Sequence, residues 1–343
     1  MTALEIIFLA LTCIGTLYYI VSTYALAVHF GRYRHKTGLS HSKPSVSILK
    51  PVSGLDADAE ENFLSYINQN HNDFEVIFGV LNDDDPSVPI LQKLSQEHKK
   101  VSFYIGSDLE GANNKVRILH NLAESATGEI IVITDADTRV KPEFLTAITA
   151  PFEDEPVGAV TCLYRGIEAK SIGDALEGLY MTCIFEPGVA CAYMLGVEFG
   201  LGAAIAVRKN ILDQSGGFKA FVDHLADDYQ LAHSIASTGK RAILSDYIVD
   251  IVFSGERLKN VLARQLRWRQ AVKASSPFGH MGLVFTYGTP YAVFLWILSG
   301  LSMLGWSALA VSLAIRLSTA YIGAQKHIGD KEIIKRIYLL PLC

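Results

Sequence analysis

The chain has 343 residues, 50% of them hydrophobic, and a mean hydropathy of +0.26. This composition is more apolar than that of ordinary soluble domains, so part of the chain is expected to lie in lipid. The net charge of -5 excludes a global basic field, and nucleic acid is therefore not an expected partner. Five cysteines without C-x-x-C spacing argue against a disulfide framework and a structural zinc site, and they favour a reducing, cytosol-facing domain.

The first apolar stretch, residues 4–28, carries a single charge, Glu5, and is long enough for a transmembrane helix. A cleaved signal peptide is the alternative, since Ala25-Leu26-Ala27 resembles a cleavage site, but no Lys or Arg precedes the run. We expect residues 1–30 to form a transmembrane anchor and 31–44 a basic juxtamembrane linker. The linker's positive charges favour a cytosolic position for the domain that follows; they are Arg32, Arg34, Lys36 and Lys43.

The C-terminal region, residues 281–343, is expected to be a second membrane region. Residues 281–315 are almost free of charge, and Pro290 and Gly300 divide them into a re-entrant turn plus a span or into two short spans. The final residues, IYLLPLC, are typical of the opening of another apolar segment, so this region is expected to be truncated.

Residues 45–255 alternate apolar runs with helical stretches, which predicts an α/β domain with a mostly parallel sheet. The predicted strands are SVSILKPV, FEVIFGVL, VSFYIG and EIIVIT, and the predicted helices are residues 58–69, 88–99 and 115–126. Open sheets of this kind bind ligands beyond the carboxyl ends of their strands. Residues that bind a ligand or catalyse a reaction are therefore expected directly after each apolar run.

Polar residues follow three of the four strands. They are Lys50-Pro51 after the first, Asp83-Asp84-Asp85 after the second and Asp135-Ala136-Asp137 after the fourth. Asp and Pro are also common at turns and helix N-caps, so each group alone is ambiguous. Several carboxylates at one rim, however, are unfavourable unless a cation or a ligand's donors compensate them.

Asp135 and Asp137 can reach one hard cation, and their oxygen ligands suit Mg²⁺ or Mn²⁺. A metal held by two carboxylates can bridge the phosphates of a nucleotide diphosphate, which is the leaving group of sugar transfer. Asp227 and Asp228 open a helical pattern, either as N-cap residues or as a general base for a lipid hydroxyl. One base acting in a single displacement inverts the anomeric carbon.

Residues 256–280 form an amphipathic stretch that contains Arg264, Arg267 and Trp268. Two interpretations remain open and are compatible with each other. The stretch is an interfacial helix that rests on the bilayer. Alternatively, the two arginines, three residues apart on one helix face, grip phosphate oxygens beside the tryptophan.

These motifs resemble the ceramide glucosyltransferase family, glycosyltransferase family 21, a membrane relative of family 2. The segments that carry the resemblance are LKPVSG, DDDP, NNKV, ITDAD, LDQSGGF, ADDY and RQLRW, in the family's order over residues 45 to about 275. The resemblance implies a GT-A fold, a Rossmann-like α/β domain that faces the cytosol between transmembrane helices. Its nucleotide-sugar half is expected at residues 45–140 and its acceptor half at 141–255.

The resemblance implies roles for Asp85, Asp135, Asp228, Arg264, Arg267 and Trp268, and the positions of the other residues at strand ends and helix starts add the remaining candidates. Asp228 is the expected catalytic base, Asp135 and Asp137 are the expected metal ligands, and Asp83, Asp84, Asp227 and Glu186 are secondary candidates. The expected nucleotide-sugar-binding residues are Lys50, Pro51, Asp85, Lys115, Asp135, Arg264, Arg267 and Trp268. The implied reaction moves glucose or N-acetylglucosamine from its UDP-sugar to a lipid, in a multi-pass protein of the bacterial inner membrane.

The lipid acceptor is left open by two departures from animal ceramide members. Those members have Asp-Ser-Gly in place of Asp135-Ala136-Asp137 and His-Pro in place of Glu186-Pro187. The chain is more similar to a bacterial branch that glycosylates hopanoid polyols, so hopanoid and ceramide both remain candidates. Two other functions compete: a processive polysaccharide synthase, which needs more spans than this sequence offers, and a non-catalytic nucleotide-sugar sensor.

Overall fold

The computed structural model describes residues 1–33, 44–56 and 58–343. Most of the expected basic linker lies outside the described residues, including Arg34, Lys36 and Lys43. The chain folds as two compact units, which we call the sheet unit and the helical unit. The sheet unit includes the described residues from 44 to Glu168 and then Glu198–Ser254; the helical unit includes α1 (Ala3–Tyr33), Ala169–Val197 and Gly255–Cys343.

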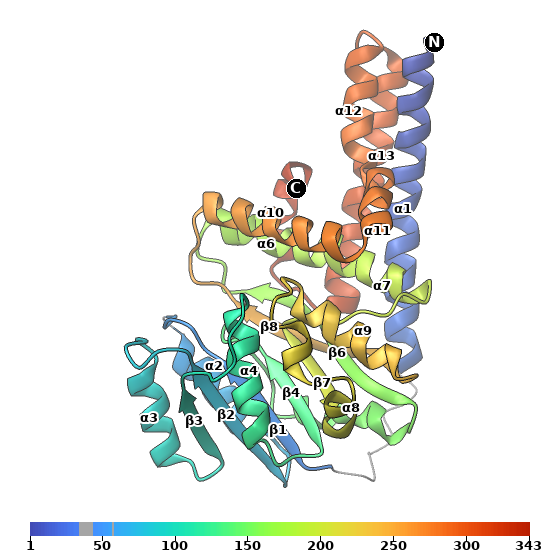
Figure 1. The fold of residues 1–343 in the computed structure, drawn as a ribbon. Helices are drawn as coiled ribbons and strands as arrows, with labels where there is room; N and C mark the ends of the chain where they lie inside the picture. Colours follow the sequence, from blue (N-terminus) through green and yellow to red (C-terminus); the bar gives the residue numbers. More distant parts are fainter. Residues whose placement is uncertain (34–43, 57) are drawn as a thin grey trace. The chain divides into compact units, whose positions relative to one another are not determined.

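The described part of the sheet unit contains an eight-stranded sheet of order β3-β2-β1-β4-β7-β6-β8-β5 (Figure 1). Its strands are β1 (Val46–Pro51), β2 (Phe74–Val80), β3 (Val101–Ile105), β4 (Ile130–Thr134), β5 (Thr138–Arg139), β6 (Val157–Ile167), β7 (Ala204–Arg208) and β8 (Arg241–Val252). The first four strands are parallel, as the alternating pattern predicted. The strand β7 runs antiparallel to β4 and β6, so the second half of the sheet is mixed.

The helices of the sheet unit cover this sheet with their apolar sides. They are α2 (Ala59–Ile67), α3 (Val88–Glu97), α4 (Asn114–Ser125), α5 (Phe144–Thr149), α8 (Lys209–Gln214) and α9 (Asp227–Ser237), with 3₁₀ turns at Ala150–Glu153 and Phe218–Phe221. Leu119 and Leu122 of α4 join Ile133 of β4 and Leu231 of α9 in one buried core. This core anchors the first turns of α4 and α9 beside the end of β4.

The strands β1, β2 and β4 are parallel neighbours, so their carboxyl ends meet at one rim of the sheet. Every residue of β1 and β4 is buried, which suits strands that are covered on both faces. The chain leaves these strands at Pro51, Leu81 and Asp135. The three predicted polar groups therefore lie along the same edge.

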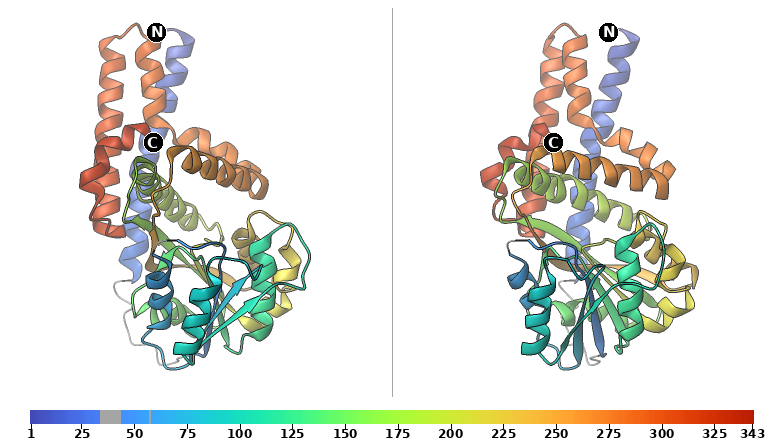
Figure 2. Two further views of the ribbon diagram at one scale, coloured as in Figure 1. Left: turned by 90° about the vertical axis from the view of Figure 1, so that its left-hand side faces the viewer. Right: turned by 60° about the vertical axis from the view of Figure 1, so that its left-hand side comes forward.

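The helical unit contains α1, α12 (Gly288–Leu298) and α13 (Met303–Ile322), which lie side by side in both views of Figure 2. The contact is tight at Gly15 and Gly288, where a Cβ atom on Gly15 would lie 2.3 Å from the Gly288 nitrogen. Ser312 Oγ lies 3.1 Å from Thr16 Oγ1 and 3.2 Å from Thr289 Oγ1. These buried hydroxyls hydrogen-bond to one another where the three helices meet.

Within the described residues, two helices are long and apolar enough to cross a membrane: Ala3–Arg32 and Met303–Ile328. The pair Pro277–Thr286 and Gly288–Leu298, bent by 52°, makes a third if it counts as one span. Gly300, at a positive φ of 65°, turns the chain from α12 into α13, as the sequence predicted for this break point.

A broken helix and a long amphipathic helix complete the helical unit. The broken helix consists of α6 (Ile172–Tyr180), the π-helical turn η2 (Met181–Phe185) and α7 (Glu186–Met194). The helix α10 (Leu258–Ser275) packs along α6, as Figure 1 shows. The remaining elements are α11 (Pro277–Gly282), η4 (Leu283–Thr286), η5 (Gly323–Ile328), α14 (Ile333–Arg336) and η6 (Ile337–Leu342).

Candidate functional site

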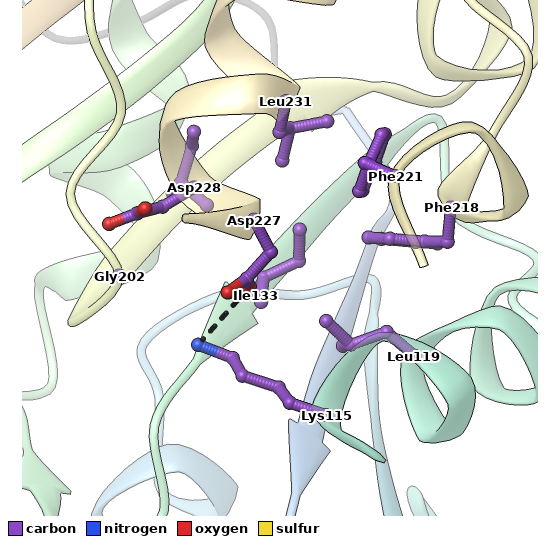
Figure 3. Close-up of a pocket in the computed structure, with 10 residues that line it drawn as sticks. Lys115, Leu119, Ile133, Gly202, Phe218, Phe221, Asp227, Asp228 and Leu231 are labelled. Carbon is purple, nitrogen blue, oxygen red and sulfur yellow. Dashed lines mark ion pairs between the residues drawn. The ribbon is translucent and has the colours of Figure 1, made fainter. Parts of the chain in front are cut away.

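Charged side chains from α4, β4 and α9 gather at the carboxyl end of β4 in the sheet unit. Lys115 Nζ lies 2.6 Å from Asp135 Oδ1 and 3.7 Å from Asp227 Oδ2, and Figure 3 shows the second of these ion pairs. Asp228 follows Asp227 on the first turn of α9 and turns its carboxylate toward Gly202. We call Lys115, Asp135, Asp227 and Asp228 the charged cluster.

Local sequence explains how the cluster is positioned. The Asn113 side chain caps α4 by accepting the backbone N–H groups of Lys115 and Val116 at 3.1 and 3.3 Å. The cap therefore fixes the first turn of α4, which carries Lys115, beside the end of β4. Asp227 and Asp228 occupy the first turn of α9, where the helix dipole stabilises negative charge.

Burial and the neighbouring charges shift the pKa values of Lys115 and Asp228. Burial opposes the charged form of Lys115, but attraction by Asp135 and Asp227 outweighs it and raises the lysine pKa above its ordinary value. For Asp228, burial and repulsion by Asp227 raise the pKa to about 6, against the attraction of Lys115. A carboxylate whose pKa lies near neutrality is suited to accept a proton.

Two glycines that the sequence did not single out border the cluster. A Cβ atom on Gly202 would lie 3.4 Å from Asp228 Oδ2, 3.6 Å from Asp135 Oδ2 and 3.7 Å from Lys115 Nζ. On Gly200, the same atom would lie 2.4 Å from the Asp228 carbonyl oxygen, closer than any side chain can approach. Both glycines precede β7, the reversed strand, and its pairing with β4 brings them to the site.

A small pocket continues from the charged cluster into apolar surroundings (Figure 3). Its apolar lining residues are Leu119, Ile133, Ile205, Phe218, Phe221 and Leu231. The two phenylalanines follow Gly216 and Gly217, which hold positive φ values of 95° and 62° in a turn. The LDQSGGF segment thus supplies Phe218 to the apolar wall, and the turn that follows it supplies Phe221.

Lys50 lies at the end of β1 with its side chain fully buried. Its Nζ donates to Thr134 Oγ1 and Thr138 Oγ1, both at 3.2 Å, and to the Asp135 carbonyl oxygen. Burial lowers the pKa of Lys50 to about 7, although Asp137 and Asp135 attract its charge. Lys50 therefore stabilises the turn that carries the aspartates, and its neighbour Pro51 ends the buried strand.

Asp85 joins the turns that follow β1 and β2. Its carboxylate accepts the N–H of Gly54 at 2.9 Å and both the N–H and the hydroxyl of Ser87, at 2.9 and 2.6 Å. Burial opposes the charged form, but these bonds hold the Asp85 pKa below its usual range. Asp83 and Asp84 are exposed in the same turn.

The two aspartates of the Asp-Ala-Asp turn suit a divalent cation that also binds a ligand. Burial and repulsion from Asp135 raise the pKa of Asp137 to about 6, against the attraction of Lys50. A hard cation would relieve that repulsion, and both side chains offer oxygen ligands. No group of three His, Cys, Asp or Glu side chains within the described ranges forms a metal site by itself. The donor set therefore fits a metal that takes further ligands from a substrate phosphate.

The remaining predicted site residues belong to the helical unit. Arg264 donates to Glu177 through both Nε and an Nη atom, while Arg267 is exposed and Trp268 half-buried on the same helix. Glu186 is buried at the start of α7. Glu177 was not identified in the sequence, where a single glutamate in an apolar helix gives no signal of a partner 87 residues away.

The fold and the cluster define a GT-A glycosyltransferase architecture. The structure is similar to a mannosyltransferase from Pyrobaculum calidifontis solved with GDP-Man and Mn²⁺, with a TM-score of 0.55 and 20% identity over 94% of this chain and 99% of that one. The model of glycosyl transferase family 21 matches residues 7–342, and the chain belongs to that family.

Curated relatives match a smaller part of the chain. Ceramide glucosyltransferase 1 of Caenorhabditis elegans is 25% identical over 67% of this chain and 50% of its own length. The beta-monoglucosyldiacylglycerol synthase of Trichormus variabilis is 26% identical over 62% of this chain and 46% of its own. The chain thus spans about half the length of these curated relatives.

Proposed function

We propose that this protein transfers a hexose, glucose or N-acetylglucosamine, from a UDP-sugar to the hydroxyl group of a membrane lipid. The charged cluster at the end of β4 carries this proposal, because it joins the lysine of NNKV to the aspartates of ITDAD and ADDY. Family 21 membership supports a lipid acceptor, and so do the activities for which the two relatives are named, the glucosylation of ceramide and of diacylglycerol.

In the proposed reaction, Asp228 accepts the proton of the lipid hydroxyl as its oxygen attacks the anomeric carbon. The bond between that carbon and the β-phosphate oxygen breaks, and UDP leaves from the opposite face with inversion. Lys115 lies within reach of Asp135 and Asp227 and offers a positive charge to the departing diphosphate. The apolar pocket wall excludes water, which would otherwise compete with the lipid hydroxyl.

Asp135 and Asp137 are proposed to hold Mg²⁺ or Mn²⁺, which would supply positive charge to the diphosphate of the donor. Lys50 keeps the turn between them in one conformation through its bonds to Thr134 and Thr138. Asp85, tied to Gly54, keeps the neighbouring rim turns in place for the nucleotide.

We further propose a multi-pass protein of a bacterial inner membrane whose sheet unit faces the cytosol. Arg32 in the last turn of α1 marks the cytosolic end of that span under the positive-inside rule. In this arrangement residues 1–30 are the anchor, 31–44 the basic linker, 45–255 the catalytic domain, 256–280 the interfacial helix and 281–343 the second membrane region.

The direct test is a product assay on membranes that contain the full chain. UDP-glucose and UDP-N-acetylglucosamine, each radiolabelled, are incubated with ceramide, diacylglycerol or a hopanoid polyol, and products are resolved by mass. We expect one sugar per lipid and one preferred pair of substrates. A polymeric product would instead indicate a processive synthase, and donor binding without any product would indicate a sensor.

The pH dependence follows from the raised pKa of Asp228. A general base must be ionised, so log(kcat/KM) is expected to fall by about one per pH unit below about pH 6 and to level off above it. Lys115 lowers the Asp228 pKa, so Lys115→Met should move the acid limb to higher pH. A pH–rate profile of the wild-type protein and of Lys115→Met measures the acid limb of each. Coincident limbs would show that Lys115 does not influence the pKa of the base.

Arg267→Lys distinguishes a phosphate grip from simple attraction to the bilayer. A lysine cannot reproduce the two-pronged contact of a guanidinium, so catalytic efficiency is expected to fall at least about tenfold, roughly 1.4 kcal/mol. Membrane association should not change, since Lys and Arg are attracted similarly to anionic lipid. The control is Arg257→Lys, because Arg257 is exposed and lies just before α10. Equal and small effects of both substitutions would mean that α10 only docks on the membrane and does not bind phosphate.

A further inference from the structure

Two buried carboxylates one turn apart on α6 hold the beginning of α10. The first is Asp174, which accepts the backbone N–H groups of Gly255 and Glu256 at 3.1 and 2.9 Å. It also accepts those of Lys170 and Ser171, at 2.9 and 3.2 Å. One side chain thus joins the two chain segments that lead into α6 and α10.

The second carboxylate, Glu177, is 0% exposed and receives the fork of Arg264, whose side chain is 30% exposed. The Arg264 Nε atom donates to Glu177 Oε1 at 2.8 Å, and an Nη atom donates to Oε2. Such two-pronged contacts fix orientation as well as distance. We call Asp174, Glu177 and Arg264 the α6–α10 clasp.

The approach of the two helices at the clasp depends on a glycine. A Cβ atom on Gly173 would lie 2.6 Å from the Glu256 carbonyl oxygen, so a larger residue there would push the helices apart. The Ser171 hydroxyl donates to that same carbonyl at 2.6 Å. The clasp therefore holds α10 close to α6 through two contacts that lie one helical turn apart on α6.

The clasp fixes the rotation of α10 about its helix axis. This rotation determines where the other side chains of α10 point. At about 100° per residue, Arg267 and Trp268 lie within roughly 60° and 40° of Arg264 around the helix. The opposite side carries Leu262 and Leu266, each 60% exposed. An apolar row that faces outward while the inner face makes ion pairs is suited to contact with lipid.

We propose that Glu177 is a positioning residue: by holding Arg264, it sets the rotation of α10, on which the proposed phosphate contacts of Arg267 and Trp268 depend. Arg264 then acts as the structural partner of Glu177 and is not a phosphate ligand, contrary to the role that its motif implies. This inference rests on the proposed function for the part that concerns Arg267. It assigns a role to a glutamate that lies outside every motif of the chain.

The test compares Glu177→Gln, Arg264→Gln and the double variant in the full chain in membranes. Each single change removes the two-pronged ion pair between Glu177 and Arg264, so we expect KM for the UDP-sugar and Ki for UDP to rise at least about tenfold, with KM for the lipid unchanged. Two glutamines can exchange neutral hydrogen bonds, so the double variant should return to within about threefold of wild type. Glu332→Gln, which removes an exposed ion pair with Lys335, is the matched control.

The outcomes separate the inference from the proposed function. If Arg264 itself bound phosphate, the double variant would remain as impaired as Arg264→Gln, and the inference would be overturned. Arg267→Ala is measured in parallel. If this variant binds UDP as tightly as wild type, Arg267 does not bind the diphosphate, and the proposed function of the R-x-x-R-W motif is refuted independently of the results for Glu177 and Arg264. Should Glu177→Gln fail to fold, Glu177→Asp keeps the charge and shortens its reach, and an unchanged KM for the donor would contradict the inference.

Discussion

Asp228→Asn is expected to lower kcat by about 10² or more while UDP-sugar affinity stays within about threefold of wild type. The amide keeps the size of the side chain but cannot accept the proton of the lipid hydroxyl. Asp228 turns toward Gly202, whereas Lys115 pairs with Asp135 and Asp227, so the change leaves these two ion pairs intact. Single-turnover rates with lipid acceptor, together with equilibrium UDP binding, measure the two effects separately.

The matched control is Asp223→Asn, an exposed aspartate that precedes α9 and accepts the Ala112 N–H at 3.0 Å. It should retain wild-type turnover. Near-normal turnover of Asp228→Asn would remove Asp228 as the base, and Asp227 would become the next candidate. Because Asp227 pairs with Lys115, a change there should disturb donor binding as well as turnover.

The first four strands of the sheet unit and the helices between them could be predicted because the sequence patterns that indicate them are local. Alternating apolar runs and helical stretches became β1 to β4 and α2 to α4 in the predicted order. The second half depends on contacts between distant segments. The reversed β7 reads like any other apolar run, and only its pairing with β4 reveals its direction. The π-helical turn at Met181–Phe185 likewise has no pattern of its own.

The charged cluster could be anticipated in part, because strand ends of a parallel sheet converge on one rim. This reasoning places Asp135 at that rim, whereas Asp227 and Asp228 are predicted only at the start of a helix, and the structure brings all three together with Lys115. The role of Lys50 could not be anticipated, since its bonds to the Asp-Ala-Asp turn depend on how β1 pairs with β4. Glu177 was missed for the same reason, because its partner lies in another helix.

Removal of divalent metal is expected to abolish transfer, and Mg²⁺ or Mn²⁺ should restore it. The repulsion between Asp135 and Asp137, which together with burial raises the Asp137 pKa, is what a cation between them would relieve. Because the described residues supply no third carboxylate, histidine or cysteine to this pair, the metal should bind weakly alone and tightly with UDP. Equilibrium dialysis of Mn²⁺ with and without UDP measures that difference.

Asp137→Ala tests the contribution of one proposed metal ligand to UDP binding. With Mn²⁺ present, the variant is expected to bind UDP at least about tenfold more weakly than wild type, whereas in EDTA the two proteins should bind UDP equally. Asp154→Ala, which removes an exposed carboxylate 2.8 Å from Arg241, is the control and should match wild type in both conditions. Full transfer activity in chelator would contradict a metal at this turn. An equal loss of UDP binding with and without metal would mean that Asp137 acts through Lys50, whose charge it attracts, and not through a cation.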